Sequence, residues 1–183
     1  MNFQELLILV AKILENLKIP YAITGGYAVS VWGRPRATFD IDVIVELLNP
    51  QIDSLKKALQ EISKVSYLDK NAMTEAVERA GEFNFIDSES GIKIDFWIAG
   101  RDPITKKEIE RRIPKTISRQ RIYFISPEDL ILSKLRWYKE SDSSRHLEDV
   151  ESILRIQKDL DLEYLKTESA KQSTSEILGP LLK

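Results

Sequence analysis

The sequence lacks cysteine altogether and has a single histidine among its 183 residues. The absence of cysteine excludes disulfide bonds and thiolate metal sites, and it is typical of a cytoplasmic protein. No apolar run approaches the ~20 residues that a membrane-spanning helix needs. The N-terminal apolar segment carries Glu5, Lys12 and Glu15 and has no basic start, so it does not read as a signal peptide. We therefore expect a cytoplasmic protein without membrane association.

The chain also lacks a large net charge. Its 27 basic and 29 acidic residues leave −2, which gives no overall attraction to nucleic acid. One stretch departs from this balance: residues 101–121 hold eight basic and three acidic side chains, a local charge of +5. We interpret this stretch either as a solvated surface or as a basic rim that contacts an RNA acceptor.

The hydrophobic pattern predicts an α/β core over residues 1–125 and a helical region over residues 126–183. Short or alternating apolar segments predict strands at 21–24, 40–47, 83–87, 92–98 and 121–125. Apolar residues at helical spacing predict helices at 2–17, 27–32, 50–62, 71–80 and near 104, and then at 127–139, 144–158 and 161–169. Ser126 is expected to cap the first helix of the second region, with Pro127 at its first position.

Three acids on two of these strands are candidate metal ligands. Asp40 and Asp42 are two residues apart, so their side chains project from the same face of a strand. Asp95 lies in an apolar run, where a carboxylate is costly to bury unless it is paired or bound to a cation. If the strands are neighbours, the carboxylates converge, and such oxygen ligands suit Mg²⁺ or Mn²⁺. The alternatives are a solvated face for the two strand acids and an ion pair between Asp95 and Lys93.

A double glycine stands ahead of these acids. Gly25 and Gly26 follow a predicted strand and open a helix, so their backbone N–H groups are available to a phosphate. Taken alone, two adjacent glycines more often form a plain turn. Together with the acids, they indicate a site for a metal-bound nucleoside triphosphate.

The order of these motifs resembles the signature of the polymerase-beta-like nucleotidyltransferase superfamily. The resemblance rests on Gly25-Gly26, on Gly33, and on the segment that runs from Arg36 through Thr38 to Asp40 and Asp42. It is closest to the small branch that includes AbiEii-type toxins and minimal nucleotidyltransferases. Two later segments, 126–135 and 145–154, are similar to that branch's next helices, and the match covers residues 19–155.

The resemblance implies a mixed sheet flanked by helices and a metal-dependent nucleotidyl transfer. An acceptor hydroxyl would attack the α-phosphorus of a nucleoside triphosphate and release pyrophosphate. Asp40, Asp42 and Asp95 would hold Mg²⁺ or Mn²⁺, and Asp95 would also act on the attacking hydroxyl as its base or by orienting it. Gly25 and Gly26 would cradle the triphosphate.

The resemblance also implies roles for residues outside the acid cluster. Lys134 would reach the nucleotide phosphates, and Asp149 would orient Lys134 or contact the nucleotide. Arg36 and Thr38 would be further phosphate contacts. The superfamily often has Gly-Ser at positions 25–26, and Ser30 would supply the hydroxyl that this chain lacks there. Lys134 and Asp149 have a plainer reading as members of surface ion pairs, and we read His146 as structural.

Three functions compete at this point. The leading one is a nucleotidyltransferase whose acceptor is an RNA, a protein or a small molecule such as an aminoglycoside; as a toxin it would have an antitoxin partner. The second is a catalytically inactive binding module or partner subunit on the same fold. The third is an enzyme that hydrolyses nucleotides and releases the γ-phosphate rather than pyrophosphate. The three carboxylates favour an active site, because a binding module does not need a charge cluster that destabilises the fold.

Overall fold

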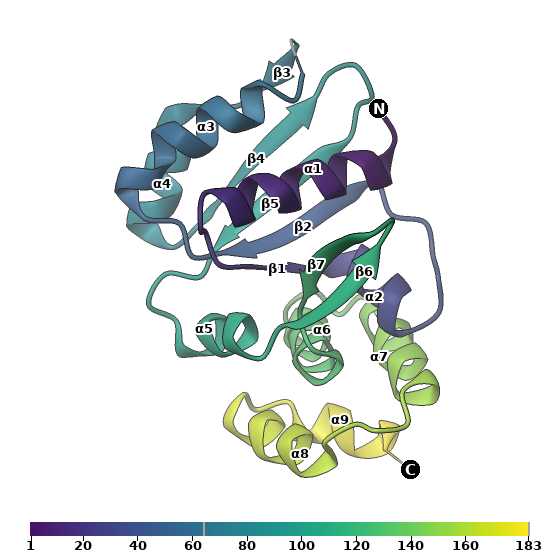
Figure 1. Ribbon diagram of the computed structural model, residues 1–183. Helices are drawn as coiled ribbons and strands as arrows, with labels where there is room; N and C mark the ends of the chain where they lie inside the picture. The colour runs from purple at the N-terminus through teal and green to yellow at the C-terminus, as the bar shows by residue number, and fades with distance from the viewer. Residues whose placement is uncertain (64, 183) are drawn as a thin grey trace. The chain divides into compact units, whose positions relative to one another are not determined.

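The computed structural model describes residues 1–63 and 65–182, and the chain forms two compact units (Figure 1). The first unit comprises Met1–Gly26 and Thr38–Ile125, and the second comprises Tyr27–Ala37 and the chain from Ser126 on. The chain first passes from one unit to the other within helix α2, Gly25–Trp32. The second unit therefore contains a short early segment as well as the C-terminal helices.

Within the described residues, the first unit is built on a seven-stranded mixed sheet with the strand order β3-β4-β5-β2-β1-β7-β6. The pairs β2–β5 and β1–β7 are parallel, and the other neighbours are antiparallel. The strands are β1 Tyr21–Thr24, β2 Asp40–Val45, β3 Ser66–Tyr67, β4 Glu82–Asp87, β5 Lys93–Ile98, β6 Ile113–Ile117 and β7 Gln120–Phe124.

The central strands owe their place to alternation of apolar and polar residues. On β2 and β5, Ile41 lies opposite Ile94 and Val43 opposite Phe96, and all four side chains are fully buried. The residues between them therefore share the other face of the sheet. A one-residue slip of either strand would exchange the two faces, so burial fixes this register.

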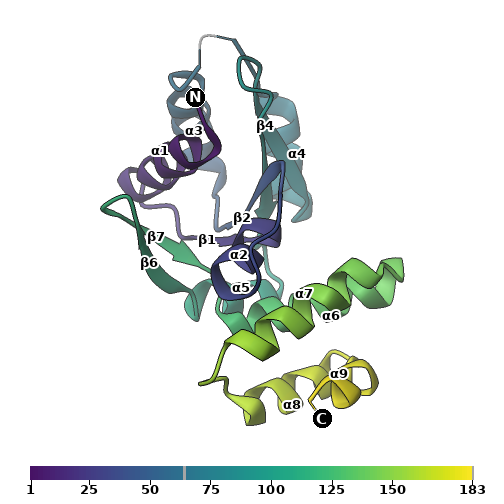
Figure 2. The ribbon, with the colours of Figure 1, turned by 90° about the vertical axis from the view of Figure 1, so that its right-hand side faces the viewer.

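Helices cover the sheet of the first unit. Helix α1, Phe3–Asn16, packs with α3, Ile52–Gln60, on one face (Figures 1 and 2), and α1 buries its apolar stripe there. Asn2 caps α1, because its side chain accepts a hydrogen bond from the Glu5 N–H at 2.9 Å. The remaining helical elements are the 3₁₀ turn Asn49–Gln51, α4 Lys70–Arg79 and α5 Pro103–Glu110.

The second unit is helical. Its elements after Ser126 are α6 Pro127–Ser141, α7 Ser144–Ile156, α8 Leu162–Lys171 and α9 Ser175–Leu181. Ser126 caps α6 as expected, because its hydroxyl oxygen accepts a hydrogen bond from the Asp129 N–H at 3.1 Å. The Asp129 carboxylate also accepts a hydrogen bond from the Tyr164 hydroxyl at 2.6 Å, which ties α8 to the start of α6.

The predicted fold class, a mixed sheet flanked by helices and followed by a helical region, is confirmed. Two strands escaped prediction, β3 with only two residues and β6, and α2 begins at Gly25 rather than at residue 27. In the part of the chain that the structure describes, no helix combines the length and the apolar character that crossing a membrane would require.

Candidate active site

The three predicted acids lie together on one face of two neighbouring strands. Asp42 on β2 is directly opposite Asp95 on β5, and Asp40 is opposite Lys93. The parallel register therefore brings Asp40, Asp42 and Asp95 to the same face, as required for the carboxylates to converge. Asp95 is only 8% exposed, so its charge needs a partner.

Lys93 supplies that partner. Its Nζ lies 2.7 Å from an Asp95 carboxylate oxygen. This is the ion pair that the sequence suggested as an alternative, because the two residues share one face of the strand. The hydrogen bond to Asp95 and the nearby charges of Asp40 and Asp42 raise the pKa of the Lys93 ammonium. In this structure a side-chain cation thus occupies the neighbourhood of the three carboxylates.

The chemistry of this cluster fits a divalent cation, although its arrangement here is that of an ion pair. The donors are carboxylate oxygens, the ligands that Mg²⁺ and Mn²⁺ prefer. Among the described residues, no group of three acidic or histidine side chains is drawn close enough to hold a metal ion as it stands. A metal ion held by Asp95 would share that carboxylate with the Lys93 ammonium or take its place.

The double glycine meets the acids directly. Gly25 has a left-handed backbone, with φ at +64°, and a Cβ atom on it would lie 1.7 Å from a carboxylate oxygen of Asp42. Only glycine allows both that conformation and that close approach. The residue that opens α2 and the central acid of the cluster are therefore neighbours in space as well as in the sequence motif.

Two polar residues complete this face of the first unit. The Thr38 hydroxyl donates a hydrogen bond to the Asp40 carboxylate at 2.9 Å, so Thr38 positions an acid. Asn84 on β4 lies directly opposite Asp95 and shares its face, and sequence reasoning missed it. The signal was present, because the buried neighbours Phe83 and Phe85 place Asn84 on the opposite side of the strand.

The other predicted phosphate contacts form a second cluster, inside the second unit. Arg36 donates two hydrogen bonds to the Asp149 carboxylate, Nε to Oδ1 at 2.8 Å and Nη2 to Oδ2 at 3.0 Å. Lys134 Nζ lies 3.4 Å from the same carboxylate. The Ser30 hydroxyl contacts both the N–H and the carbonyl of Arg36 at 3.2 Å, so Ser30 holds the backbone of that arginine.

Burial makes this second cluster more than a surface pair. Asp149 is 3% exposed and Lys134 is 7% exposed. Two cations, Arg36 and Lys134, thus share the Asp149 carboxylate. A cavity of about 360 Å³ lies beside the cluster and is lined by Arg34, Arg36, Glu148, Asp149, Glu151, Ser152 and Arg155.

A second glycine allows the early segment to reach α7. A Cβ atom on Gly33 would lie 2.5 Å from the Ser152 hydroxyl and 3.2 Å from Ile153. The following N–H, of Arg34, donates a hydrogen bond to the same Ser152 hydroxyl. Gly33 therefore permits close packing of 27–37 against α7, which places Arg36 beside Asp149.

His146 borders this cluster and has an abnormal pKa. Burial lowers its pKa, the nearby Lys134 charge lowers it further, and Asp149 partly opposes both effects; Arg36 and Arg145 act in the same direction as Lys134. We expect an NMR titration of this single histidine to give a pKa below the reference of about 6.5. The unfolded chain then binds more protons, so His146 makes the fold less stable as the pH falls through that range. A value at or above that of the urea-unfolded protein would contradict this prediction.

Comparison with known proteins assigns this chain to a family. The family model described as nucleotidyl transferase AbiEii toxin, type IV toxin–antitoxin system, matches residues 8–176. A search of curated proteins gives no match.

Solved structures share the fold at low sequence identity. An antigenic nucleotidyltransferase-like protein from Paracoccidioides brasiliensis is 16% identical with a TM-score of 0.60, over 98% of this chain and 91% of that one. ANT(2")-Ia, solved in complex with adenylyl-2"-tobramycin, is 14% identical with a TM-score of 0.63, over 93% and 98% of the two chains. The lincosamide antibiotic adenylyltransferase LnuA, solved with lincomycin, is 13% identical with a TM-score of 0.56, over 84% and 97%.

The neighbours agree with the family in fold, and the family model spans most of the chain. The resemblance inferred from the glycine and aspartate motifs is thereby confirmed. The chain belongs to the AbiEii family of nucleotidyltransferase toxins of type IV toxin–antitoxin systems.

Proposed function

We propose that this nucleotidyltransferase is metal-dependent and moves a nucleoside monophosphate from a nucleoside triphosphate to an acceptor hydroxyl. The observation that carries the proposal is the placement of Asp40, Asp42 and Asp95 on one face of β2 and β5, next to Gly25. Carboxylates so arranged repel one another unless a cation lies among them. The Lys93 ammonium beside Asp95 supports this view, because it marks where positive charge is needed.

Asp40, Asp42 and Asp95 would hold Mg²⁺ or Mn²⁺, with Thr38 fixing the orientation of Asp40. Such an ion supplies charge neutralisation at the transferring phosphoryl group. Asp95, the most buried of the three, would also orient the attacking hydroxyl or accept its proton. The α-phosphorus would form a bond to that hydroxyl oxygen while its bond to pyrophosphate breaks.

The remaining predicted residues would bind the nucleotide. The backbone N–H groups of Gly25 and Gly26 would meet phosphate oxygens. In the second unit, Lys134 and Arg36 would provide cationic contacts, with Asp149 orienting both of them. Ser30 would act through Arg36, whose backbone it holds, rather than as a direct replacement for the missing Gly-Ser hydroxyl.

The acceptor in this proposal is an RNA hydroxyl. The basic stretch 101–121 favours an RNA hydroxyl over a protein or a small molecule, because it provides local positive charge in a chain of net −2. As a member of a toxin–antitoxin family, the protein would also have an antitoxin partner, which would restrain this activity.

The test is transfer of label from each α-³²P nucleoside triphosphate to total RNA or to lysate protein, with Mg²⁺, with Mn²⁺ and with EDTA. We expect label on RNA with metal only, together with release of pyrophosphate. The Asp40→Asn/Asp42→Asn variant is the negative control. Label on protein alone would indicate a protein acceptor in place of RNA. Release of phosphate without transfer would indicate hydrolysis.

The alternative is a catalytically inactive binding module, which the Lys93–Asp95 ion pair permits because it satisfies the buried Asp95 without a metal. Thermal unfolding separates the two readings. An active site would be stabilised by MgATP or MnATP, and the double Asn variant would lose that shift. Absence of any nucleotide-dependent shift, together with absence of transfer, would favour the binding module.

A further inference from the structure

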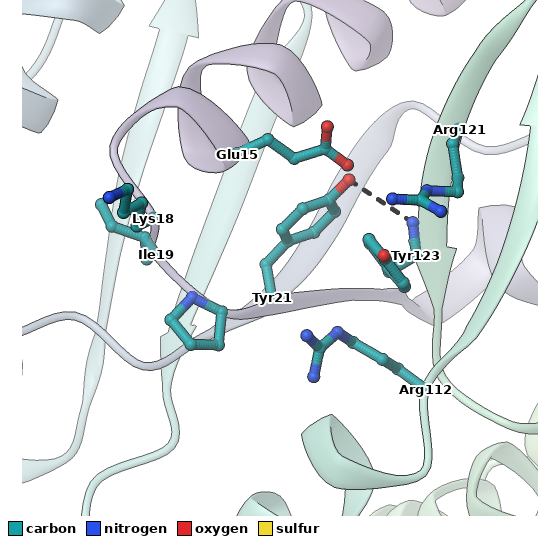
Figure 3. Close-up of a pocket in the computed structure, with 8 residues that line it drawn as sticks. Glu15, Lys18, Ile19, Tyr21, Arg112, Arg121 and Tyr123 are labelled. Carbon is teal, nitrogen blue, oxygen red and sulfur yellow. Dashed lines mark hydrogen bonds between the residues drawn. The ribbon is translucent and has the colours of Figure 1, made fainter.

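A second pocket lies in the first unit, away from the acids. It has a volume of about 350 Å³ and opens beside the start of β1 (Figure 3). Tyr21, the first residue of β1, lines it and pairs with Val45, whereas Asp42 pairs with Thr24 at the other end of the strand. The pocket is therefore at the opposite end of β1 from the acid cluster. Its polar lining consists of Glu15, Lys18, Tyr21, Arg112, Arg121 and Tyr123.

The pocket contains two buried polar atoms without partners. Among the described residues, only three buried side-chain polar atoms lack a hydrogen bond, and two of them are Glu15 Oε1 and Arg112 Nε. An unsatisfied buried polar atom is destabilising, so its retention calls for an explanation. One atom is an acceptor and the other is a donor. Neither atom has accessible surface, so a ligand that satisfied both would need an acceptor and a donor of its own and a local rearrangement of the pocket.

The side chains around these atoms are held in place. The Arg112 guanidinium lies 4.8 Å from the centre of the Tyr123 ring and donates a hydrogen bond to the Ile109 carbonyl at 2.6 Å. The Arg121 guanidinium lies 5.5 Å from the same ring. Figure 3 shows the Glu15 carboxylate and Arg121 near the hydroxyl end of Tyr21. A guanidinium stacked on an aromatic ring keeps N–H groups in its plane for an anion.

Tyr21 adds a neutral hydroxyl to the site. Burial raises the pKa of this phenol well above its ordinary value, so it stays protonated. Its oxygen accepts a hydrogen bond from the Tyr123 N–H at 3.4 Å, which is the dashed line in Figure 3. The phenol fixes one wall of the pocket without adding charge.

The charges of the lining select the class of ligand. Lys18, Arg112 and Arg121 oppose Glu15 alone, which leaves a net charge of +2. An amino-acid zwitterion would leave that charge uncompensated, whereas a phosphomonoester, with close to two negative charges at neutral pH, would balance it. Inorganic phosphate has an O–H to donate, but donating it to Glu15 would bring the charged anion against a carboxylate that repels it. A phosphate joined to a group with N–H donors satisfies all of these requirements.

We propose that this pocket binds a nucleotide unit, with its phosphate on the cationic side chains and N–H donors of its base on Glu15. Arg121 is exposed, so its guanidinium would offer a plane on which the base stacks. The pocket's volume is at the small end of the range for ligand sites, which suits a single nucleotide. A free nucleotide and the end of a single-stranded RNA offer this same chemistry.

The experiment measures binding to the full chain in EDTA, so that the metal-dependent acid cluster does not contribute. The probes are the four nucleoside 5′-monophosphates, inorganic phosphate and a single-stranded RNA hexamer. Glu15→Leu is the informative variant, because it removes the acceptor and also makes the pocket more positive. Its melting temperature is measured on the same preparation, so that a loss of binding through unfolding is recognised.

We expect Glu15→Leu to weaken monophosphate binding about tenfold, while inorganic phosphate binding stays the same or tightens. Arg112→Gln should weaken the binding of both the monophosphate and inorganic phosphate. Arg119→Gln is the matched control, because Arg119 is exposed on the β6–β7 turn and does not line the pocket, and it should change neither by more than about twofold.

Tighter monophosphate binding by Glu15→Leu would overturn the proposal, because it would reveal a site for anions in general. Failure of every monophosphate and of the hexamer to bind would overturn it as well. Loss of hexamer and monophosphate binding in the same variants would support it, and the tighter of the two ligands would identify the source of the nucleotide. Transfer activity is not read in this experiment, so its outcome is independent of the proposed function.

Discussion

Changing both strand acids, Asp40→Asn with Asp42→Asn, is expected to lower the rate of nucleotidyl transfer by a factor of about 10³ or more. The two changes remove most of the negative charge that would hold a divalent cation, while the side chains keep their shape. Stability should stay equal or rise, because carboxylates on one face no longer repel one another. Initial rates of label transfer and thermal unfolding, measured on the same preparations, check both parts.

The matched control for this pair is Asp53→Asn. Asp53 is an exposed acid of the same unit and pairs with Lys70 on the surface, so its loss should leave the transfer rate unchanged. A double variant that kept a tenth of the activity would exclude the acids from catalysis. A large drop in melting temperature together with the loss of activity would assign them to the fold instead.

Gly25→Ala is the second change with a large expected effect. The new Cβ atom would lie 1.7 Å from the Asp42 carboxylate, and the backbone would keep a left-handed conformation that costs about 1–2 kcal/mol with a side chain. Either Asp42 or the turn must move, so we expect the transfer rate to fall about 100-fold or more. Steady-state transfer kinetics together with urea unfolding measure the two effects separately.

Gly91→Ala separates strain from the loss of the site. Gly91 has a similar φ of +72°, and a Cβ atom there would have no neighbour within 4 Å. We therefore expect the same backbone cost in unfolding free energy and no change in transfer rate. Equal rates for the two alanine variants would show that the contact between Gly25 and Asp42 is unimportant for catalysis.

Local patterns were enough for much of the fold. The apolar stripe of α1, the Ser126-Pro127 start of α6 and the alternation on β2 each reflect burial or capping over a few residues. Strand β6 could not be predicted in this way. It contains Pro114 and exposes Lys115 and Thr116, so it has neither the composition nor the alternation of a buried strand. It is a strand because it pairs with β7 at the edge of the sheet.

Contacts between distant segments explain what the sequence left open in the candidate site. Lys93 and Asp95 are two residues apart on one strand, so the alternation of strand faces was enough to suggest their ion pair. The pairing of Arg36 with Asp149 joins residues 113 positions apart and depends on Gly33 fitting against α7. The unpartnered atoms of Glu15 and Arg112 likewise come from α1 and from the segment after α5, and no local pattern signals their meeting.

The ammonium of Lys93, which lies among the strand acids, would compete with any metal ion for the Asp95 carboxylate. If a divalent cation binds there, as proposed, it would compete with a tethered cation, so the acid cluster would behave as an ion exchanger. Lys93 serves as the counterion of Asp95 in the structure described here. The affinity for a metal would then be set by the difference between two cations, and a phosphate group bound with the metal would offer Lys93 a new partner.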